Sequence, residues 1–242
     1  MKKRSIQELE RDLKKIRTEN ILDVATGRGE FLNTIIHALG SYKSVTGIDS
    51  NESALNMARE NFKKTNSKFL KMDAYNLTFN PESFDMVCLS NSLHHFSEIE
   101  QILANMKKVL KTGGYFIINE MHKDNQQIEE QKTHILMHHW WSVIDTRSGI
   151  VHNKTFNSSR IVNLVSALQL QELKIYEYAY QINDPKDEKM IATYMNYIDS
   201  YSNKIKDHDD FEMLREQGRY LKIRLRDIGF APASNLFVMG KK

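Results

Sequence analysis

The chain has 242 residues, enough for one large core, so we expect one domain with insertions rather than two independent domains. Hydrophobic residues make up 40% and charged residues 27%, a balance typical of globular rather than disordered proteins. The net charge of +3 is only mildly basic, and the lysines and arginines are spread along the chain. This distribution disfavours a nucleic-acid partner, which usually requires basic residues gathered on one face.

The single cysteine, Cys88, excludes an intramolecular disulfide and a cysteine-based metal cluster. The N-terminus is polar and lacks the apolar core of a signal peptide. No stretch approaches the roughly 18 apolar residues that a membrane span requires. We therefore expect a cytoplasmic protein without a membrane partner.

The first half of the chain alternates short apolar strands with amphipathic helices. A helix within residues 1–18 begins with Ser5-x-x-Glu8, which is a capping box, and Ser97-x-x-Glu100 is a second one. Such alternation predicts right-handed crossovers and a parallel sheet. The expected strands are residues 21–25, 44–48, 68–72, 84–89 and 115–119, with helices between them at about 31–39, 51–62 and 97–110.

After Glu120 the alternation is interrupted twice. We expect a helical insertion at residues 121–157, rich in histidine and tryptophan and lying over the active site. A second helical insertion at 181–228 is expected to be a lid or a dimer contact. Between and after these insertions, a helix at 158–168 and strands at 172–180 and 234–239 return to the sheet.

Four loops follow the expected strands, at the edge of the sheet where open α/β proteins bind ligands. In the first loop, Gly27 and Gly29 precede a helix whose free N–H groups can bind a carboxylate. Asp49, about twenty residues further on, can accept both hydroxyls of a ribose. The other two loops are Asp73-Ala74 and Ser90-Asn91-Ser92. A glycine turn alone is often only a tight connection, but the combination predicts a nucleoside ligand.

A nicotinamide dinucleotide fits the glycine pattern poorly. The fingerprint G-x-G-x-x-G would place its first glycine where this chain has Ala25, and its third glycine is absent. An NAD-dependent oxidoreductase is therefore disfavoured.

The same segments resemble the motifs of class I S-adenosylmethionine-dependent methyltransferases, in the family's order and over roughly the first half of the chain. Residues 21–29 (Ile-Leu-Asp-Val-Ala-Thr-Gly-Arg-Gly) resemble motif I, especially in the ubiquinone/menaquinone-biosynthesis branch. Residues 46–49 resemble motif II, and residues 71–74 resemble the adenine-side motif. Residues 84–96 are similar to motif IV of small-molecule enzymes, and 109–114 to the turn before the fifth strand.

This resemblance implies one methyltransferase domain over residues 1–242. Its fold would be α/β, with a doubly wound, mostly parallel seven-stranded sheet, an antiparallel last strand and helical insertions. The implied cofactor is S-adenosyl-L-methionine. Asp23, Gly27 and Gly29 would meet its methionyl portion, Asp49 the ribose, Asp73 and Ala74 the adenine, and Asn91 the sulfonium side. The full set of expected cofactor residues is Asp23, Ala25, Thr26, Gly27, Gly29, Asp49, Ser50, Asp73, Ala74, Ser90 and Asn91.

Methyl transfer from a sulfonium is an in-line displacement, so the protein mainly contributes alignment and exclusion of water. A general base is needed only when the acceptor is protonated. Seven of the nine histidines fall between His94 and His152, and they could be core residues, bases or ligands. His134 and His138 share a helix face at zinc-ligand spacing, but without a H-E-x-x-H glutamate we expect no metal. The candidates for a base are His94, His95, His122 and His139.

Aromatic residues in the insertions could form flat walls for a substrate or pack in the core. The substrate-binding candidates are His138, Trp140 and Trp141, with Tyr178, Tyr180 and Tyr194 as further flat surfaces.

The sequence Ser90-Asn91-Ser92-Leu93 lacks the Asn/Asp-Pro-Pro-Tyr of amino-methylating DNA and RNA enzymes. We therefore expect methyl transfer to an O, N or C atom of a small molecule. The alternatives are a non-catalytic sensor that binds S-adenosylmethionine or S-adenosylhomocysteine and, less favoured, an NAD-dependent oxidoreductase. No nucleic-acid partner is expected, and a homodimer is allowed.

Overall fold

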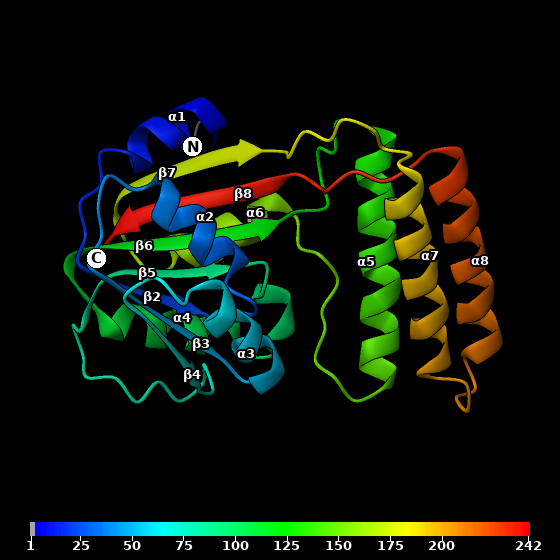
Figure 1. Cartoon of the computed structure of the whole chain (residues 1–242), viewed down its shortest axis with the longest axis horizontal. Helices are drawn as coiled ribbons and strands as arrows, with labels where there is room; N and C mark the ends of the chain where they lie inside the picture. Colours follow the sequence, from blue (N-terminus) through cyan, green and yellow to red (C-terminus); the bar gives the residue numbers. More distant parts are fainter. Residues whose placement is uncertain (1–2) are drawn as a thin grey trace.

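The apolar strands assemble into one eight-stranded sheet in a computed structural model that describes residues 3–242 (Figure 1). The strand order is β1-β7-β8-β6-β5-β2-β3-β4. The last strand, β8, runs antiparallel to both of its neighbours, and all other pairs are parallel, as predicted. The strands are β1 (Lys3–Arg4), β2 (Asn20–Val24), β3 (Ser44–Asp49), β4 (Ser67–Lys71), β5 (Phe84–Ser90), β6 (Leu110–Met121), β7 (Gln171–Tyr178) and β8 (Asn235–Lys241).

The expected number of seven strands was too low by one. Lys3 and Arg4 pair with Ile175 and Tyr176 of β7. Two charged residues carry no apolar strand pattern, so nothing in the sequence marks β1. Their pairing covers backbone groups that β7 would otherwise present at the sheet edge.

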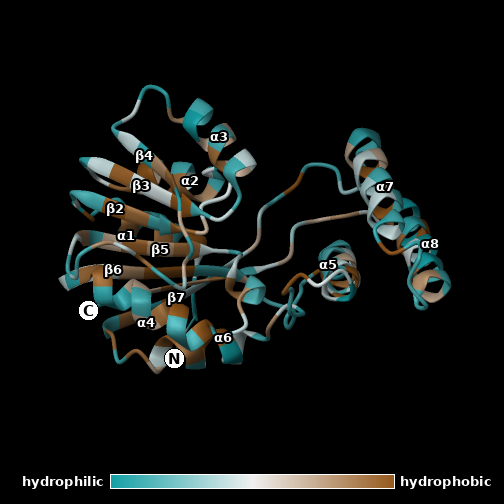
Figure 2. Cartoon of the chain, turned by 90° about the horizontal axis from the view of Figure 1, so that it is seen from below, coloured by the Kyte–Doolittle hydropathy of each residue, from teal (hydrophilic) through white to brown (hydrophobic). Residues whose placement is uncertain are grey.

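Five helices cover the two faces of the sheet. Successive strand residues point to opposite faces, so Met86 and Cys88 pack on one side while Val87 and Leu89 pack on the other. The face of Met86 is covered by α1 (Ile6–Leu13), α2 (Glu30–Ala38) and α3 (Glu52–Asn61), and the opposite face by α4 (Ile99–Val109) and α6 (Ser158–Ser166). Apolar residues accordingly concentrate along the strands in Figure 2.

The two predicted helix caps had different outcomes. The capping box at Ser5 is confirmed: its hydroxyl accepts the Glu8 N–H at 3.3 Å, and the Glu8 carboxylate accepts the Ser5 N–H at 2.9 Å. The cap at Ser97 was wrong, since α4 begins at Ile99 without a side-chain cap. The Ser97 N–H instead donates to the Tyr75 hydroxyl at 3.0 Å, so a tertiary contact satisfies this backbone group.

The helices of the two insertions pack together into one three-helix bundle. These helices are α5 (Glu129–Arg147), α7 (Glu188–Asn203) and α8 (Phe211–Asp227). Trp140, Ile198 and Leu221 are buried in their shared core. Figures 1 and 2 show the bundle set beyond the carboxyl ends of the parallel strands. Within residues 3–242, none of the helices combines the length and apolar character needed to cross a bilayer.

Candidate active site

A cavity of about 640 Å³ lies at the carboxyl ends of β2, β5 and β6. This is the edge at which doubly wound sheets bind ligands. Residues from the turn after β2, the start of α2 and the ends of β5 and β6 form its walls. The lining residues are Asp23, Ala25, Thr26, Gly27, Arg28, Glu30, Phe31, Thr34, Ser90, Asn91, Ser92, Asn119 and Tyr180.

The turn after β2 has an unusual backbone. Ala25, Gly27 and Gly29 all have positive φ, at +54°, +54° and +80°. Such a conformation costs a non-glycine residue such as Ala25 about 1–2 kcal/mol. Asp49 helps to hold the turn, because its Oδ2 accepts the Gly27 N–H at 2.8 Å. The Asp49 side chain therefore links the end of β3 to the turn that lines the cavity.

Gly29 allows α3 to pack close to this turn. A Cβ at Gly29 would lie 2.7 Å from Cε2 of Phe62, in addition to the strain of its φ. We expect Gly29→Ala to lower the free energy of unfolding by about 2–4 kcal/mol, measured by urea denaturation. Gly149→Ala is the matched control, since Gly149 has φ +79° but open space around its Cβ. The control should lose only about 1 kcal/mol. Equal losses in the two variants would contradict the packing argument.

Asp23 is a buried carboxylate on the cavity wall. Its Oδ2 accepts the Thr26 hydroxyl at 2.7 Å, and its Oδ1 has no hydrogen-bond partner among residues 3–242. Burial, together with the charge of Asp49, raises the pKa of Asp23 to about 7. A buried acid with a free oxygen beside a cavity is typical of a site that awaits a cationic or donor group.

The ends of β5 and β6 contribute a network of side-chain amides and hydroxyls to the cavity wall. Asn91, at φ +45°, accepts the Met121 N–H at its Oδ1 at 2.9 Å. The Asn119 amide donates to the Ser90 hydroxyl and accepts the Tyr178 hydroxyl, both at 2.9 Å. These bonds hold the ends of β5 and β6 in one arrangement.

The cavity gathers part of the predicted cofactor set. The members that line it are Asp23, Ala25, Thr26, Gly27, Ser90 and Asn91. Gly29 shapes the turn as the N-cap of α2. Asp49, Ser50, Asp73 and Ala74 lie at the ends of β3 and β4, outside the cavity lining, and their cofactor contacts stay predictions.

Sequence reasoning did not assign six lining residues to the cofactor. They are Arg28, Glu30, Phe31, Thr34, Ser92 and Asn119. Asn119 is the last residue of the strand expected at 115–119, although β6 continues to Met121, so the rule that had selected Asn91 after β5 would also have found it. Phe31 and Thr34 lie one turn apart on α2 and face the cavity. The sequence alone does not show which side of this helix faces the cavity. Tyr180, noted only as a flat surface, also lines the cavity.

The four histidines proposed as bases lie in different environments. His94 is buried with Nδ1 2.9 Å from Glu120 Oε1, whereas His95 is exposed. His122 is fully buried, with Nε2 3.0 Å from Glu177 Oε1 but out of hydrogen-bond alignment. Burial, reinforced by nearby lysines, lowers the pKa of His139 to about 4, so His139 is neutral at pH 7. The catalytic role of each remains a prediction.

The substrate-binding candidates on α5 separate into two groups. Trp140 is buried in the bundle and its indole N–H donates to the Leu214 carbonyl at 2.8 Å. Trp141 packs against Tyr201 in the same bundle. Neither tryptophan lines the cavity, which favours the core role that the sequence left open. His138 instead lies against His94, at the side of α5 that meets the sheet domain.

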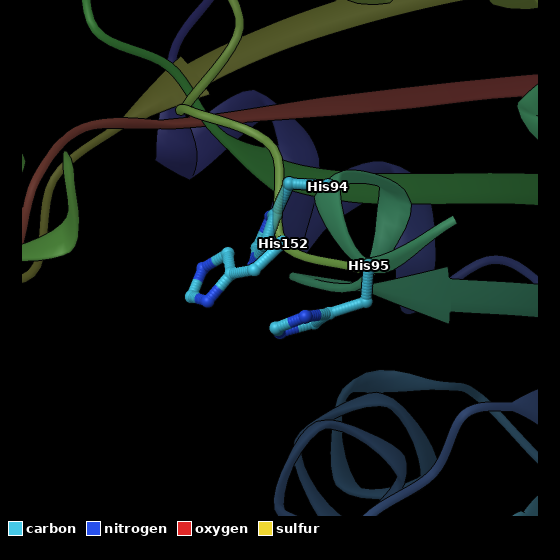
Figure 3. A group of neighbouring side chains, drawn as sticks. All are labelled: His94, His95 and His152. Carbon is cyan, nitrogen blue, oxygen red and sulfur yellow. The ribbon is translucent and has the colours of Figure 1, made fainter. Parts of the chain in front are cut away.

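The expected pair of His134 and His138 does not form a metal site. His134 Nδ1 accepts the Ala233 N–H at 2.9 Å, and its ring packs against Phe230. The ring of His138 lies close to those of His94 and His152. Figure 3 shows His94, His95 and His152 gathered in one group.

A protein family described as a methyltransferase domain matches residues 17–183. The chain belongs to this family, the class I S-adenosylmethionine-dependent methyltransferases. The matched range includes the turn after β2, Asp49, Asn91 and Tyr180. The family's cofactor is therefore S-adenosylmethionine, as the motifs had implied.

Individual relatives are similar over part of their length. The demethylmenaquinone methyltransferase of Bacteroides fragilis is 34% identical over 113 residues, which cover 45% of this chain and 46% of that protein. The demethylmenaquinone methyltransferase of Thermotoga maritima is 27% identical over 160 residues, covering 65% and 69%. The match thus spans about half the length of the first of these curated relatives. The YcgJ protein of Bacillus subtilis shares the fold, with a TM-score of 0.63, 17% identity and 98% and 97% coverage.

Proposed function

We propose that this protein transfers a methyl group from S-adenosylmethionine to an O, N or C atom of a small molecule. The observation that carries this proposal is the cavity at the carboxyl edge of the sheet, which is lined by Asn91 and by Asp23, whose Oδ1 has no hydrogen-bond partner among residues 3–242. The glycine turn leaves backbone room between them for the methionyl portion. Asp49 lies one hydrogen bond from this turn, where a ribose would follow.

In methyl transfer, the main contribution of the protein is to align S-adenosylmethionine with the acceptor molecule. The cofactor supplies an activated methyl group, and displacement at that carbon must be in line. Asp23 would orient the ammonium of the methionyl portion, while the rigid network around Asn119 would keep one wall of the cavity in place. Phe31 and Tyr180 would narrow the space around the reacting centre and exclude water.

A small-molecule acceptor is supported by the names of the relatives. Those names refer to demethylmenaquinone and to phthiotriol dimycocerosates, which are small molecules rather than nucleic acids or proteins. Because the match covers 46% of the Bacteroides enzyme and 40% of the phthiotriol/phenolphthiotriol dimycocerosates methyltransferase of Mycobacterium tuberculosis, we carry over the class of acceptor and not its identity.

Calorimetry with two ligands tests the cofactor assignment. We expect S-adenosylhomocysteine to bind and NAD to give no heat under the same conditions, because the chain lacks the first and third glycines of the dinucleotide fingerprint. Binding of NAD alone, or of neither ligand, would contradict the proposal.

A second measurement separates an enzyme from a sensor. The protein is incubated with methyl-deuterated S-adenosylmethionine and a small-molecule extract, and products are analysed by mass spectrometry. An enzyme yields a labelled product that the Asp23→Asn variant forms more slowly. A sensor binds S-adenosylhomocysteine but labels nothing in any extract.

A further inference from the structure

Four histidines from three segments lie close together near the cavity, and none of them is among its lining residues. His94 and His95 follow β5, His138 lies on α5, and His152 lies between α5 and α6. Their neighbouring rings have centroids 4.3–4.8 Å apart. One ring nitrogen from each of His94, His95 and His152 lies within 4.8 Å of the others (Figure 3). Ser92, which lines the cavity, is only two residues from His94.

The Nε2 atoms of three of these rings converge. His138 Nε2 is 3.3 Å from His94 Nε2 and 3.2 Å from His152 Nε2. Tetrahedral zinc with Zn–N bonds of about 2.0–2.1 Å places its ligand nitrogens about 3.3–3.4 Å apart. The two separations from His138 are close to this spacing, and the rings of His94 and His152 have centroids 5.3 Å apart.

The outer nitrogens of His94 and His152 face carboxylates. His94 Nδ1 is 2.9 Å from Glu120 Oε1, and His152 Nδ1 is 2.7 Å from Asp145 Oδ2. A carboxylate only accepts hydrogen bonds, so in each of these two rings Nδ1 carries a hydrogen and Nε2 is the atom that faces His138. A carboxylate behind the histidine is the usual arrangement around metal-binding imidazoles.

His138 completes this arrangement from the helix. Its Nδ1 is 2.9 Å from the Thr155 hydroxyl, and its Nε2 faces the other two rings. A single hydrogen on His138 Nε2 can point to only one of the two neighbouring Nε2 atoms at a time. All three side chains are buried, so water compensates little. A cation between the rings satisfies all three nitrogens at once.

We propose that His94, His138 and His152 bind a zinc ion through their Nε2 atoms, with the exposed His95 on the open side of the ion. Neutral imidazoles suit zinc among the divalent metals. Three protein ligands with one open side are typical of catalytic rather than structural zinc. The zinc proposal can be tested separately from the proposed methyl transfer, because its test measures bound metal and not turnover.

The test is the zinc content of the full-length protein. The metal-stripped protein is titrated with zinc chloride against a chromophoric chelator, and the retained metal is measured by elemental analysis after dialysis. We expect one zinc ion per chain. His152→Ala, which changes a loop residue, and His138→Ala should each weaken zinc binding by about 100-fold or more, beyond the loss expected for an outer partner.

Two further sets of variants make the result specific. Glu120→Gln and Asp145→Asn should weaken zinc binding by about 10–100-fold, because these carboxylates orient His94 and His152. His139→Ala, adjacent to His138 on the same helix, should bind zinc as the parent does. Circular dichroism checks the fold of each variant. The proposal is overturned if the parent retains no zinc, or if folded His152→Ala binds zinc as tightly as His139→Ala does.

Discussion

Replacing Asp23 by asparagine should stabilise the protein without ligand and weaken its binding of S-adenosylhomocysteine. The Asp23 carboxylate is 1% exposed, and burial raises its pKa from 3.8 to about 7. At pH 8 the charged form is therefore held in an unfavourable environment. A shift of this size corresponds to about 4 kcal/mol, which is the upper limit of the stabilisation expected in Asp23→Asn. The asparagine can still accept the Thr26 hydroxyl.

The stabilisation expected in Asp23→Asn depends on pH. Between pH 4 and 7 the folded protein holds a proton on Asp23 that the unfolded chain has released. The contribution of Asp23 to the free energy of unfolding therefore falls as pH rises through this window and stays low above it. In Asp23→Asn this fall is absent, so the two proteins should differ most at pH 8 and little near pH 4, as measured by urea denaturation.

Asp85→Asn provides a control of opposite sign. Burial favours protonation of Asp85, but hydrogen bonds from Lys111 and the Asn20 N–H outweigh it and lower the pKa of this carboxyl. Asp85 lies at the start of β5, at the other end of that strand from the cavity. Its replacement should reduce stability at neutral pH and leave S-adenosylhomocysteine affinity unchanged. A loss of stability in both variants would contradict our account of Asp23.

Ligand binding should change in the opposite direction from stability in Asp23→Asn. A charge-assisted hydrogen bond to the ligand ammonium contributes about 1.5–3 kcal/mol, so affinity should fall by about tenfold to a hundredfold at pH 8. In the parent protein, affinity should also rise with pH through about 7 as Asp23 loses its proton. Calorimetry at pH 6 and 8 measures both effects. An unchanged affinity in the folded variant removes Asp23 from the cofactor site.

Asp49→Ala should lower the affinity for S-adenosylhomocysteine by at least tenfold. The carboxylate would lose charge-assisted bonds to the ribose, each contributing about 1.5–3 kcal/mol. It would also release the Gly27 and Asn51 N–H groups, which it now accepts at 2.8 Å.

A deoxy analogue separates the two effects of Asp49. The parent protein should bind S-adenosylhomocysteine more tightly than its 2′-deoxy form, whereas Asp49→Ala should bind the two alike. If Asp49→Ala retains the preference, then Asp49 only supports the turn and does not contact the ribose.

Local features of the sequence were sufficient for the sheet and for much of the cavity that we propose as the cofactor site. Apolar runs such as residues 84–89 have the length and composition of buried strands, and parallel topology brings the ends of those strands to one edge. Asp23 lies near the end of one such run and Asn91 follows directly after another, so their place at the cavity could be predicted without long-range information. Asn119 lies near the end of β6, paired with Ser90, and was overlooked.

The histidine cluster and the bundle depend on contacts that only the tertiary structure decides. His138 meets His94 across 44 residues of chain, and Trp140 donates to Leu214 across 74. Helical spacing predicted that His134 and His138 share one face of α5. In the structure, however, His134 Nδ1 accepts the Ala233 N–H, whereas His138 lies against His94. The sequence by itself determined the parallel sheet and the loops that line the cavity, because strand length and the residues at strand ends are local properties. Which insertion residues pack in the bundle and which face the site depends on how α5, α7 and α8 share their apolar surfaces, and only the assembled chain specifies that.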